Sequence, residues 1–315
     1  MEKLVDVPKC NVVPVIDLGK GLGDGDNRTD LVHQLLKASQ EFGMFQVVNH
    51  GIPEELLNDT KSVCEEFCEL PAEDKASLLS DDPECKLITG ITKYETDRIH
   101  FWRDYLRHPC HPSEECMKSW PQKPTRYREV VAAYSIEAKK LGLRILELLC
   151  QGLGIDTNYF EGKLSEYVQL VVNYYPPCPD PSLTAPGLPK HSDIGILTIL
   201  SQGDVCGLQL FKDGEWLNAE PLPNALVVNI AYLFQVISNK KLKSAEHRAV
   251  TNSSRARMSV GFFIYPSDGG ILEPAAADES NPPLFRAFQF NEFMRNFYSV
   301  GRNLELAIQP FKLET

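Results

Sequence analysis

The stretch Lys190-His191-Ser192-Asp193-Ile194-Gly195-Ile196-Leu197-Thr198-Ile199-Leu200 joins a candidate metal-binding pair to an apolar run. His191 and Asp193 are two residues apart, so an extended backbone would direct both side chains to one face. The run from Ile194 to Leu200 is rich in β-branched residues and predicts a strand. We therefore expect the pair to lie at the mouth of a sheet.

A third candidate ligand, His247, precedes Ala249-Val250, another β-prone pair. Two imidazoles and one carboxylate on one face of an octahedral metal leave three positions free, which is the pattern of non-haem iron(II) oxygenases. The three residues do not require this interpretation by themselves. His-x-Asp pairs occur by chance, and a lone histidine is more often an ordinary hydrogen-bonded residue than a ligand.

Arg257-Met258-Ser259 follows His247 and gives the metal interpretation its second observation. Arginine and serine two residues apart share one face of a strand. The planar fork of arginine suits bidentate capture of a carboxylate, and a serine hydroxyl adds a further donor. This arrangement would hold the far end of an anionic cosubstrate whose other end chelates the metal.

The motifs together resemble those of the plant iron(II)/2-oxoglutarate-dependent dioxygenase family. The resemblance covers most of the chain, because further family signatures lie at Val13–Leu18, Phe42–Pro53, Trp102–Leu106 and Asn173–Pro179. Within the family, the sequence of residues 119–124, 127–131 and 173–181 is most similar to that of the hyoscyamine hydroxylase branch.

The resemblance implies a set of cofactors and site residues. The implied cofactors are iron(II), 2-oxoglutarate and molecular oxygen, with ascorbate as reductant. The implied metal ligands and catalytic residues are His191, Asp193 and His247. The implied 2-oxoglutarate-binding residues are Arg257, Ser259, Asn173 and Tyr175.

The resemblance also implies hydroxylation of a small plant specialised metabolite, with an alkaloid as one candidate and epoxidation or desaturation as a possible second step. Trp102, Tyr105 and Leu106 are expected in the substrate pocket by analogy with the family. Tyr232 and Phe234 are added because the stretch after Asn229-Ile230 departs from the common Gly-Asp pattern. A hormone, a phenolic or flavonoid-type substrate, or an ascorbate-dependent oxidase of the same fold is the alternative.

Periodicity predicts a fold of mixed α and β structure. Helices are expected from about Thr29 to Phe42, from Pro53 to Leu70 and from Pro124 to Gly154. Short β-prone runs begin at Gln169, and Lys212-Asp213-Gly214-Glu215 indicates a hairpin between two of them. We expect a double-stranded β-helix (jelly-roll) core in residues 166–315, braced by a helix-rich region in residues 1–165.

Composition narrows the remaining possibilities. The 315 residues are 43% hydrophobic and 24% charged, with a net charge of −11, which is typical of a globular protein and disfavours nucleic acid as a partner. No apolar run approaches membrane-spanning length and no signal peptide is recognised, so we expect a cytoplasmic monomer acting on a small molecule. The nine cysteines are expected to be free thiols.

Two other metal chemistries remain open. His100, His108 and His111 lie near Cys110 and Cys116, but intervening prolines and the lack of a Cys-x-x-Cys pair disfavour zinc there. A zinc hydrolase could use the three candidate ligands, although it has no need of Arg257-x-Ser259. A non-catalytic jelly-roll protein would be expected to have lost a ligand, and none is lost.

Overall fold

The computed structural model describes residues 13–21, 26–78, 86–88, 92–93, 100–111, 113–178 and 187–314. The helices are α1 (Asp26–Glu41), α2 (Glu54–Glu69), α3 (Ala72–Lys75), α4 (Ser113–Cys116), α5 (Tyr127–Leu153), α6 (Tyr232–Ile237), α7 (Phe290–Ser299) and α8 (Leu304–Ile308). The strands of the first half are β1 (Val15–Asp17), β2 (Met44–Val48), β3 (Lys86–Ile88), β4 (Thr92–Lys93), β5 (His100–Phe101) and β6 (Asp104–Pro109). Those of the second half are β7 (Tyr167–Tyr175), β8 (Leu188–His191), β9 (Leu197–Ser201), β10 (Leu208–Lys212), β11 (Glu215–Asn218), β12 (Leu226–Ile230), β13 (His247–Ala249), β14 (Arg257–Tyr265), β15 (Ile271–Leu272) and β16 (Phe288–Gln289).

Two sheets form a jelly-roll core, as the sequence predicts. The larger sheet has the order β1-β2-β12-β9-β14-β7-β6-β3, and the smaller has the order β11-β10-β13-β8. The pairings within both are antiparallel, except that β1 runs parallel to β2. Four strands of the larger sheet come from the first half of the chain, which therefore contributes to the barrel as well as bracing it. The boundary near residue 165 stays a prediction.

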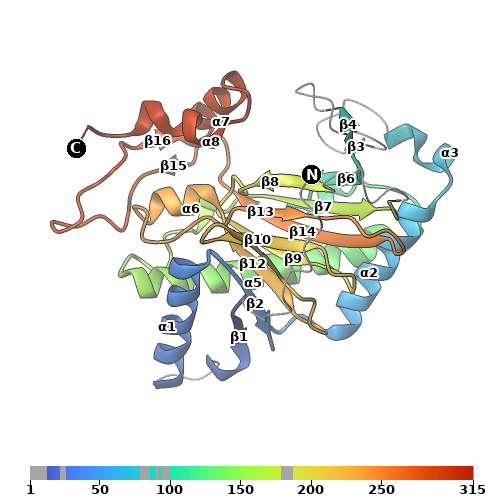
Figure 1. Cartoon of the computed structure of the whole chain (residues 1–315), viewed down its shortest axis with the longest axis horizontal. Coiled ribbons are helices and arrows are strands. Elements are labelled where there is room, and N and C mark those ends of the chain that lie inside the picture. The colour runs from blue at the N-terminus through green and yellow to red at the C-terminus, as the bar shows by residue number, and fades with distance from the viewer. Residues whose placement is uncertain are drawn as a thin grey trace.

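The two faces of the larger sheet carry different residues. Val260, Phe262 and Ile264 alternate along β14 with Ser259 and Gly261, and all three are in the apolar core that includes the buried face of α5. Residues 257 and 259 of β14 lie on the opposite face, which is the inner face of the barrel. In Figure 1, α1 and α5 lie below most of the strands, and β8 of the smaller sheet lies above them.

The longest helix, α5, packs closely on the larger sheet. It begins at Tyr127, three residues after the proline expected to open it, and ends at Leu153. Gly154 follows in the left-handed region at φ 72°, as a helix-ending glycine often does. A side chain at Gly142 would place its Cβ 2.4 Å from Cδ1 of Ile264 on β14. The absence of a side chain there lets the helix approach the sheet.

The predicted hairpin is confirmed. Strands β10 and β11 pair antiparallel, with Lys212 opposite Glu215. The two residues between them have positive φ, 52° at Asp213 and 89° at Gly214. An Asp-Gly turn of this kind matches the right-handed twist of the flanking strands.

Other sequence expectations agree with the structure to within a few residues. Helix α1 begins at Asp26, three residues before the expected Thr29, while α2 matches the expected 53–70 helix closely. Between residues 78 and 100 the structure describes β3 and β4, and most of the rest of that stretch lies outside the described residues. No helix in the described part of the chain is long and apolar enough to cross a membrane.

Packing at Gly142 can be tested by substitution. Gly142→Leu should lower the free energy of unfolding by about 1–3 kcal/mol, because the added carbons overlap Ile264 in a filled core. Urea unfolding followed by circular dichroism measures the change. Ala133→Leu, on an exposed position of the same helix, is the matched control and should be nearly neutral. Equal behaviour of the two variants would contradict the close helix-to-sheet contact.

Candidate metal centre and cosubstrate site

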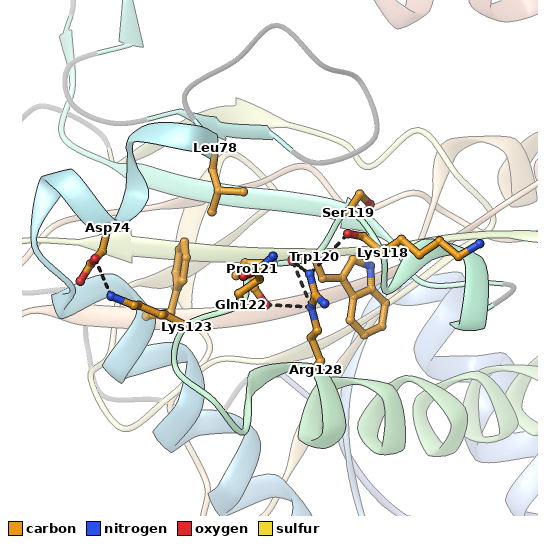
Figure 2. Close-up of a pocket in the computed structure, with 10 residues that line it drawn as sticks. Asp74, Leu78, Lys118, Ser119, Trp120, Pro121, Gln122, Lys123 and Arg128 are labelled. Atoms are coloured by element: carbon orange, nitrogen blue, oxygen red, sulfur yellow. Dashed lines mark hydrogen bonds and ion pairs between the residues drawn. The ribbon is translucent and has the colours of Figure 1, made fainter.

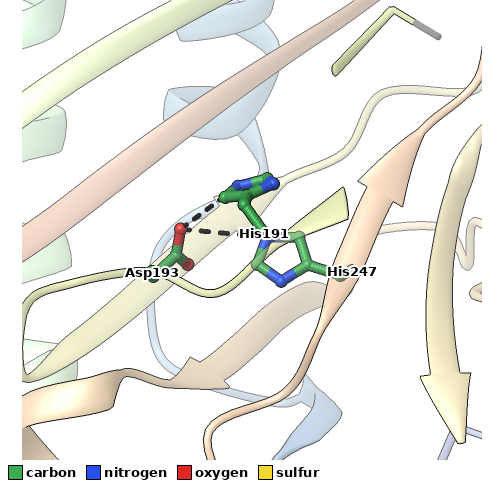
Figure 3. A group of neighbouring side chains, drawn as sticks. All are labelled: His191, Asp193 and His247. Carbon is green, nitrogen blue, oxygen red and sulfur yellow. Dashed lines mark ion pairs between the residues drawn. The ribbon is translucent and has the colours of Figure 1, made fainter. Parts of the chain in front are cut away.

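The pairing of β8 with β13 brings the two candidate histidines together. His191 is the last residue of β8, His247 is the first of β13, and the two are registered directly opposite each other. Their ring centroids lie 4.2 Å apart. The sequence predicts an extended backbone through both His191 and Asp193, but β8 ends at His191 and Asp193 lies two residues beyond it. Figure 3 shows the carboxylate of Asp193 turned toward both rings.

Hydrogen bonds fix the orientation of both imidazoles. Nδ1 of His191 donates to the carbonyl oxygen of Pro189 at 2.8 Å, and Nδ1 of His247 donates to that of Ala245 at 3.0 Å. Each Nε2 is thereby left as the free nitrogen, which is the form that binds a metal. The two Nε2 atoms lie 3.7 and 3.8 Å from Oδ1 of Asp193.

The geometry fits one shared metal ion. One ligand atom from each of the three residues lies within 4.8 Å of the others, and among the described residues this is the group that could hold a metal. Asp193 and His247 are 7% and 5% exposed, whereas His191 is half-buried. A largely buried set of two nitrogens and one oxygen, with no fourth ligand among the described residues, suits a metal that keeps positions open for chemistry.

Asp193 is held by contacts that the sequence analysis did not identify. Nδ2 of Asn229 on β12 donates to Oδ2 of Asp193 at 3.1 Å, which leaves Oδ1 facing the histidines. The backbone N–H of Tyr232 donates to the carbonyl oxygen of Asp193 at 2.8 Å, and that of Leu233 to the carbonyl of Gly195 at 3.1 Å. The first turn of α6 therefore anchors the segment that carries the carboxylate.

Protonation states at the centre are those that metal binding needs. Burial and His191 lower the pKa of His247 to about 4, so its imidazole is neutral at physiological pH. Burial opposes ionisation of Asp193, but the adjacent His247 and His191 outweigh it and hold the pKa of the carboxyl below its ordinary value. A neutral imidazole and an ionised carboxylate are the coordinating forms.

Four residues predicted to hold 2-oxoglutarate lie together on the inner face of the larger sheet. Arg257 is registered opposite Tyr175, and Ser259 is registered opposite Asn173, across the pairing of β14 with β7. All four are buried, with Arg257 only 1% exposed. The expected sharing of one strand face by Arg257 and Ser259 is what the structure has.

Arg257 is a buried cation without a carboxylate partner among the described residues. Its Nε donates to the carbonyl oxygen of Val205 at 3.2 Å, and its Cζ lies 5.3 Å from the centroid of the Tyr175 ring. Burial lowers the pKa of its guanidinium, although an arginine stays charged. A Cβ at Gly207 would lie 2.7 Å from Cδ of Arg257, so a larger residue there would displace the side chain. An anionic ligand would supply the missing counter-charge.

Arg103 is a second buried arginine, 8% exposed, that the sequence analysis named only within a family signature. Its Nη1 donates to Oδ1 of Asn173 at 3.1 Å, and its Cζ lies 4.5 Å from the Tyr105 ring centroid. This bond turns the amide nitrogen of Asn173 away from Arg103. The sequence could have indicated Arg103, because it lies two residues before Tyr105 and so shares a face with it on an extended segment.

The predicted pocket residues fall on different faces. Tyr105 on β6 is registered opposite Asn173 and so lies on the inner face. Leu106, the next residue, is 1% exposed in the helix-covered core, because alternate residues of a strand point to opposite faces. Trp102 is half-buried just before β6, and its Nε1 has no hydrogen-bond partner in the part of the chain that the structure describes.

Tyr232 and Phe234 both belong to α6 and both are buried. The hydroxyl of Tyr232 donates to Oε1 of Glu305 on α8 at 3.3 Å. Phe234 has no exposed surface, and its ring meets that of Phe160 edge-on with centroids 4.8 Å apart. The structure thus places both rings in the core, and the hydroxyl of Tyr232 also links α6 to the C-terminal segment.

Histidine 108 is a structural residue in this fold. It is fully buried, its Nε2 lies 2.9 Å from the Tyr127 hydroxyl, and burial lowers its pKa to about 4. Among the described residues it joins no group that could hold a metal. The seven cysteines that the structure describes are all free.

A cavity of about 300 Å³ lies between α2 and the segment before α5, and none of the candidate ligands lines it. Figure 2 shows that its polar groups largely satisfy one another. Arg128 donates to the carbonyl oxygen of Trp120 at 2.6 Å, and Lys123 pairs with Asp74 at 2.7 Å. We assign it no part in catalysis.

Comparison with known families identifies the class of protein. Residues 167–266 match the 2OG-Fe(II) oxygenase superfamily, and residues 13–125 match the N-terminal model of the non-haem dioxygenase in morphine synthesis. The chain belongs to the 2OG-Fe(II) oxygenase superfamily. It is a dioxygenase of plant type that uses iron(II), 2-oxoglutarate and molecular oxygen.

Individual relatives agree with this class. The chain is 40% identical to hyoscyamine 6-dioxygenase of Hyoscyamus niger, over 98% of this chain and 92% of the relative. It is also 40% identical to 2'-deoxymugineic-acid 2'-dioxygenase of Hordeum vulgare, over 93% and 87%. The crystal structure of JOX2 in complex with 2OG, Fe and JA superposes with a TM-score of 0.82 at 32% identity, covering 96% of this chain and 89% of that one.

Removal of the carboxylate ligand should abolish metal binding. Asp193→Ala leaves two neutral imidazoles, so we expect iron content after anaerobic loading to fall to background and product formation to be lost. Metal analysis by mass spectrometry measures the first. Glu279→Ala, an exposed acidic position, is the control. Near-normal iron content in Asp193→Ala would contradict the assigned ligands.

Loss of the Asn229 contact should weaken the centre without removing a ligand. In Asn229→Leu the Oδ2 atom of Asp193 loses its donor, and contacts of this kind typically contribute about 10- to 100-fold in metal affinity. Competition for iron(II) with a chelator of known affinity gives the change. Asn158→Leu, on an exposed turn, should bind iron(II) like the wild type. Unchanged affinity in Asn229→Leu would show that Asp193 needs no such support.

Proposed function

We propose that this dioxygenase hydroxylates a small plant metabolite inside the barrel, with His191, Asp193 and His247 holding iron and Arg257 holding 2-oxoglutarate. The observation that carries the proposal is the buried, carboxylate-free Arg257 on the inner face, in a barrel whose other sheet carries a three-ligand centre. A barrel built only to hold a structural metal has no use for that cation.

The residues divide the work of positioning. Nδ1 hydrogen bonds hold both imidazoles, while Asn229 and the first turn of α6 hold Asp193. Arg257 and Ser259, with Tyr175 and Asn173 beside them, would bind the distal carboxylate of 2-oxoglutarate. Iron(II) with oxygen and 2-oxoglutarate supplies the oxidising power, and the cosubstrate leaves as succinate and carbon dioxide. Burial of the site keeps water from competing for the reaction.

An alkaloid substrate is suggested by the similarity to hyoscyamine 6-dioxygenase. The similarity to an enzyme named for deoxymugineic acid is as high, so the relatives support several substrate classes. The alternative of an ascorbate-dependent oxidase is disfavoured, because the chain belongs to a superfamily that uses 2-oxoglutarate and the buried Arg257 would bind it. The expected monomeric state and cytoplasmic location remain predictions.

Incubation with a metabolite extract tests the proposal. The anaerobically purified enzyme is supplied with iron(II), ascorbate, 2-oxoglutarate and air, and products are sought by mass for the gain of one oxygen atom. Succinate should form in step with product. Product formation that persists without 2-oxoglutarate would overturn the proposal in favour of the oxidase.

Replacement of Arg257 by lysine should damage cosubstrate binding alone. Lysine keeps the charge but loses the paired donors that match a carboxylate. The loss of about 1.5–3 kcal/mol corresponds to an increase of roughly 10- to 100-fold in the KM for 2-oxoglutarate. Iron(II) affinity should not change, which separates this effect from unfolding. An unaltered KM for 2-oxoglutarate would refute the assignment of Arg257 as its carboxylate-binding residue.

A further inference from the structure

Strand β6 carries an arginine that neither the metal centre nor the cosubstrate site explains. Leu106 and His108 of this strand are 1% and 0% exposed on the helix-covered side. Tyr105 and Arg107 alternate with them and so lie on the inner face. Register supports this, because Tyr105 is opposite Asn173 on β7, which is opposite Ser259 on β14.

Arg107 occupies the next inner-face row of the sheet. It is registered opposite Val171, and Val171 is opposite Gly261. On the β7 side, the row of Arg107 thus holds an aliphatic side chain and a position with no side chain, and on the β3 side Arg107 is registered opposite Lys86. The predicted 2-oxoglutarate residues lie on the rows toward the start of β14, so Arg107 lies on the side of that group away from Arg257.

The charge of Arg107 has no partner in the described part of the chain. Its Nε is buried and makes no hydrogen bond, and no carboxylate pairs with it there. A guanidinium half-removed from water without a counter-ion costs free energy that a bound anion would recover. The chain as a whole has a net charge of −11, so an unpaired cation here is a local exception.

The row of Arg107 lies between those of the predicted cosubstrate residues and Tyr265, which is the last residue of β14. A Cβ at Gly195, two residues after Asp193, would lie 2.9 Å from the Tyr265 ring. The end of β14 toward which Arg107 is displaced is therefore beside the segment that carries a metal ligand. A molecule bound through Arg107 would have its body near the centre.

Arg103 does not fill the same role. It is 8% exposed and its Nη1 donates to Asn173, so it orients a residue of the predicted cosubstrate site. Its Nε, like that of Arg107, has no hydrogen-bond partner among the described residues. Arg103 precedes β6, and three residues lie between it and Arg107, which sets their Cα atoms about 13 Å apart at 3.3–3.4 Å per residue. Because Arg103 is bonded to Asn173, Arg107 is the arginine left for a second anion.

We propose that the organic substrate carries a carboxylate and that Arg107 binds it, fixing which part of the substrate faces the metal centre. This inference rests on the proposed function and deepens it by naming the substrate class. The proposal favours an acid over the amine of an alkaloid, because the positive charge of Arg107 would repel a protonated amine. Arg257 would bind the cosubstrate and Arg107 the substrate. Replacing Arg257 should therefore change the KM for 2-oxoglutarate, and replacing Arg107 should change the KM for the substrate.

The first experiment separates substrates by charge. A plant metabolite extract is divided by ion exchange at neutral pH into acidic, neutral and basic fractions, and each is incubated with the complete enzyme. Compounds that gain one oxygen atom should come from the acidic fraction, and methyl esterification of that fraction should abolish their conversion. Conversion confined to neutral or basic compounds, or unaffected by esterification, would overturn the proposal while leaving the proposed function intact.

The second experiment uses variants with the acid so identified. Arg107→Leu should raise its KM by about 10- to 100-fold, as expected for the loss of a charge-assisted hydrogen bond, and Arg107→Lys should lie between. The KM for 2-oxoglutarate and its substrate-independent decarboxylation should stay near wild type. Arg295→Leu, on an exposed position of α7, is the matched control.

A binding measurement completes the test without turnover. Under nitrogen, with iron(II) and 2-oxoglutarate present, the acid should raise the melting temperature of the wild type and of Arg295→Leu but not that of Arg107→Leu. An equal rise in all three proteins would refute the contact. A parallel increase in the KM values for acid and 2-oxoglutarate would place Arg107 in the cosubstrate site and also sink the proposal. If no fraction is converted and no succinate forms even in the wild type, the proposed function itself fails.

Discussion

The antiparallel pairing of β8 with β13 is the constraint on which the centre depends. It sets His191 directly opposite His247, although more than fifty residues separate them in the chain. The other residues of the site are placed relative to this pair. Asp193 completes the set only because the chain leaves β8 at His191 and is held by Asn229 and the first turn of α6. The two histidine bonds to backbone carbonyls are local and come from the same two strand ends.

The two sheets divide the chemistry of the site between them. The smaller sheet supplies the histidines, while the larger supplies a buried face with Arg257, Ser259, Asn173 and Tyr175 in adjacent register. Burial of a cation without a carboxylate costs several kcal/mol, a cost that a fold keeps only where a ligand offsets it. The jelly roll makes this possible because its inner face is enclosed while the outer face of the larger sheet packs on α5. Stability comes from the outer face and reactivity from the inner one.

Alternation along β6 separates residues that the sequence presents as one motif. Tyr105 and Leu106 are adjacent, yet one faces the barrel and the other the helix-covered core. The same alternation brings Arg107 to the inner face. Phe234 behaves like Leu106, because its ring is closed off by Phe160 and contributes to the packing of α6. Neighbouring residues of one strand therefore face the packed core and the barrel interior in turn.

The sequence by itself determined the class of fold, the residue types of the metal centre and the shared face of Arg257 and Ser259, because strand periodicity and ligand chemistry are local properties. It also determined the β10–β11 hairpin, since an Asp-Gly turn needs only its own backbone angles. The contacts that Asn229 and Arg103 make, and the anchoring of Asp193 by α6, were decided by tertiary structure. Their partners lie 36, 70 and 39 residues away in the chain, and no local pattern specifies which strands become neighbours or how they are registered. Leu106 and Phe234 were expected in the substrate pocket but are buried in the core. Only the packed sheet and helix decide which face of an element is closed to a ligand.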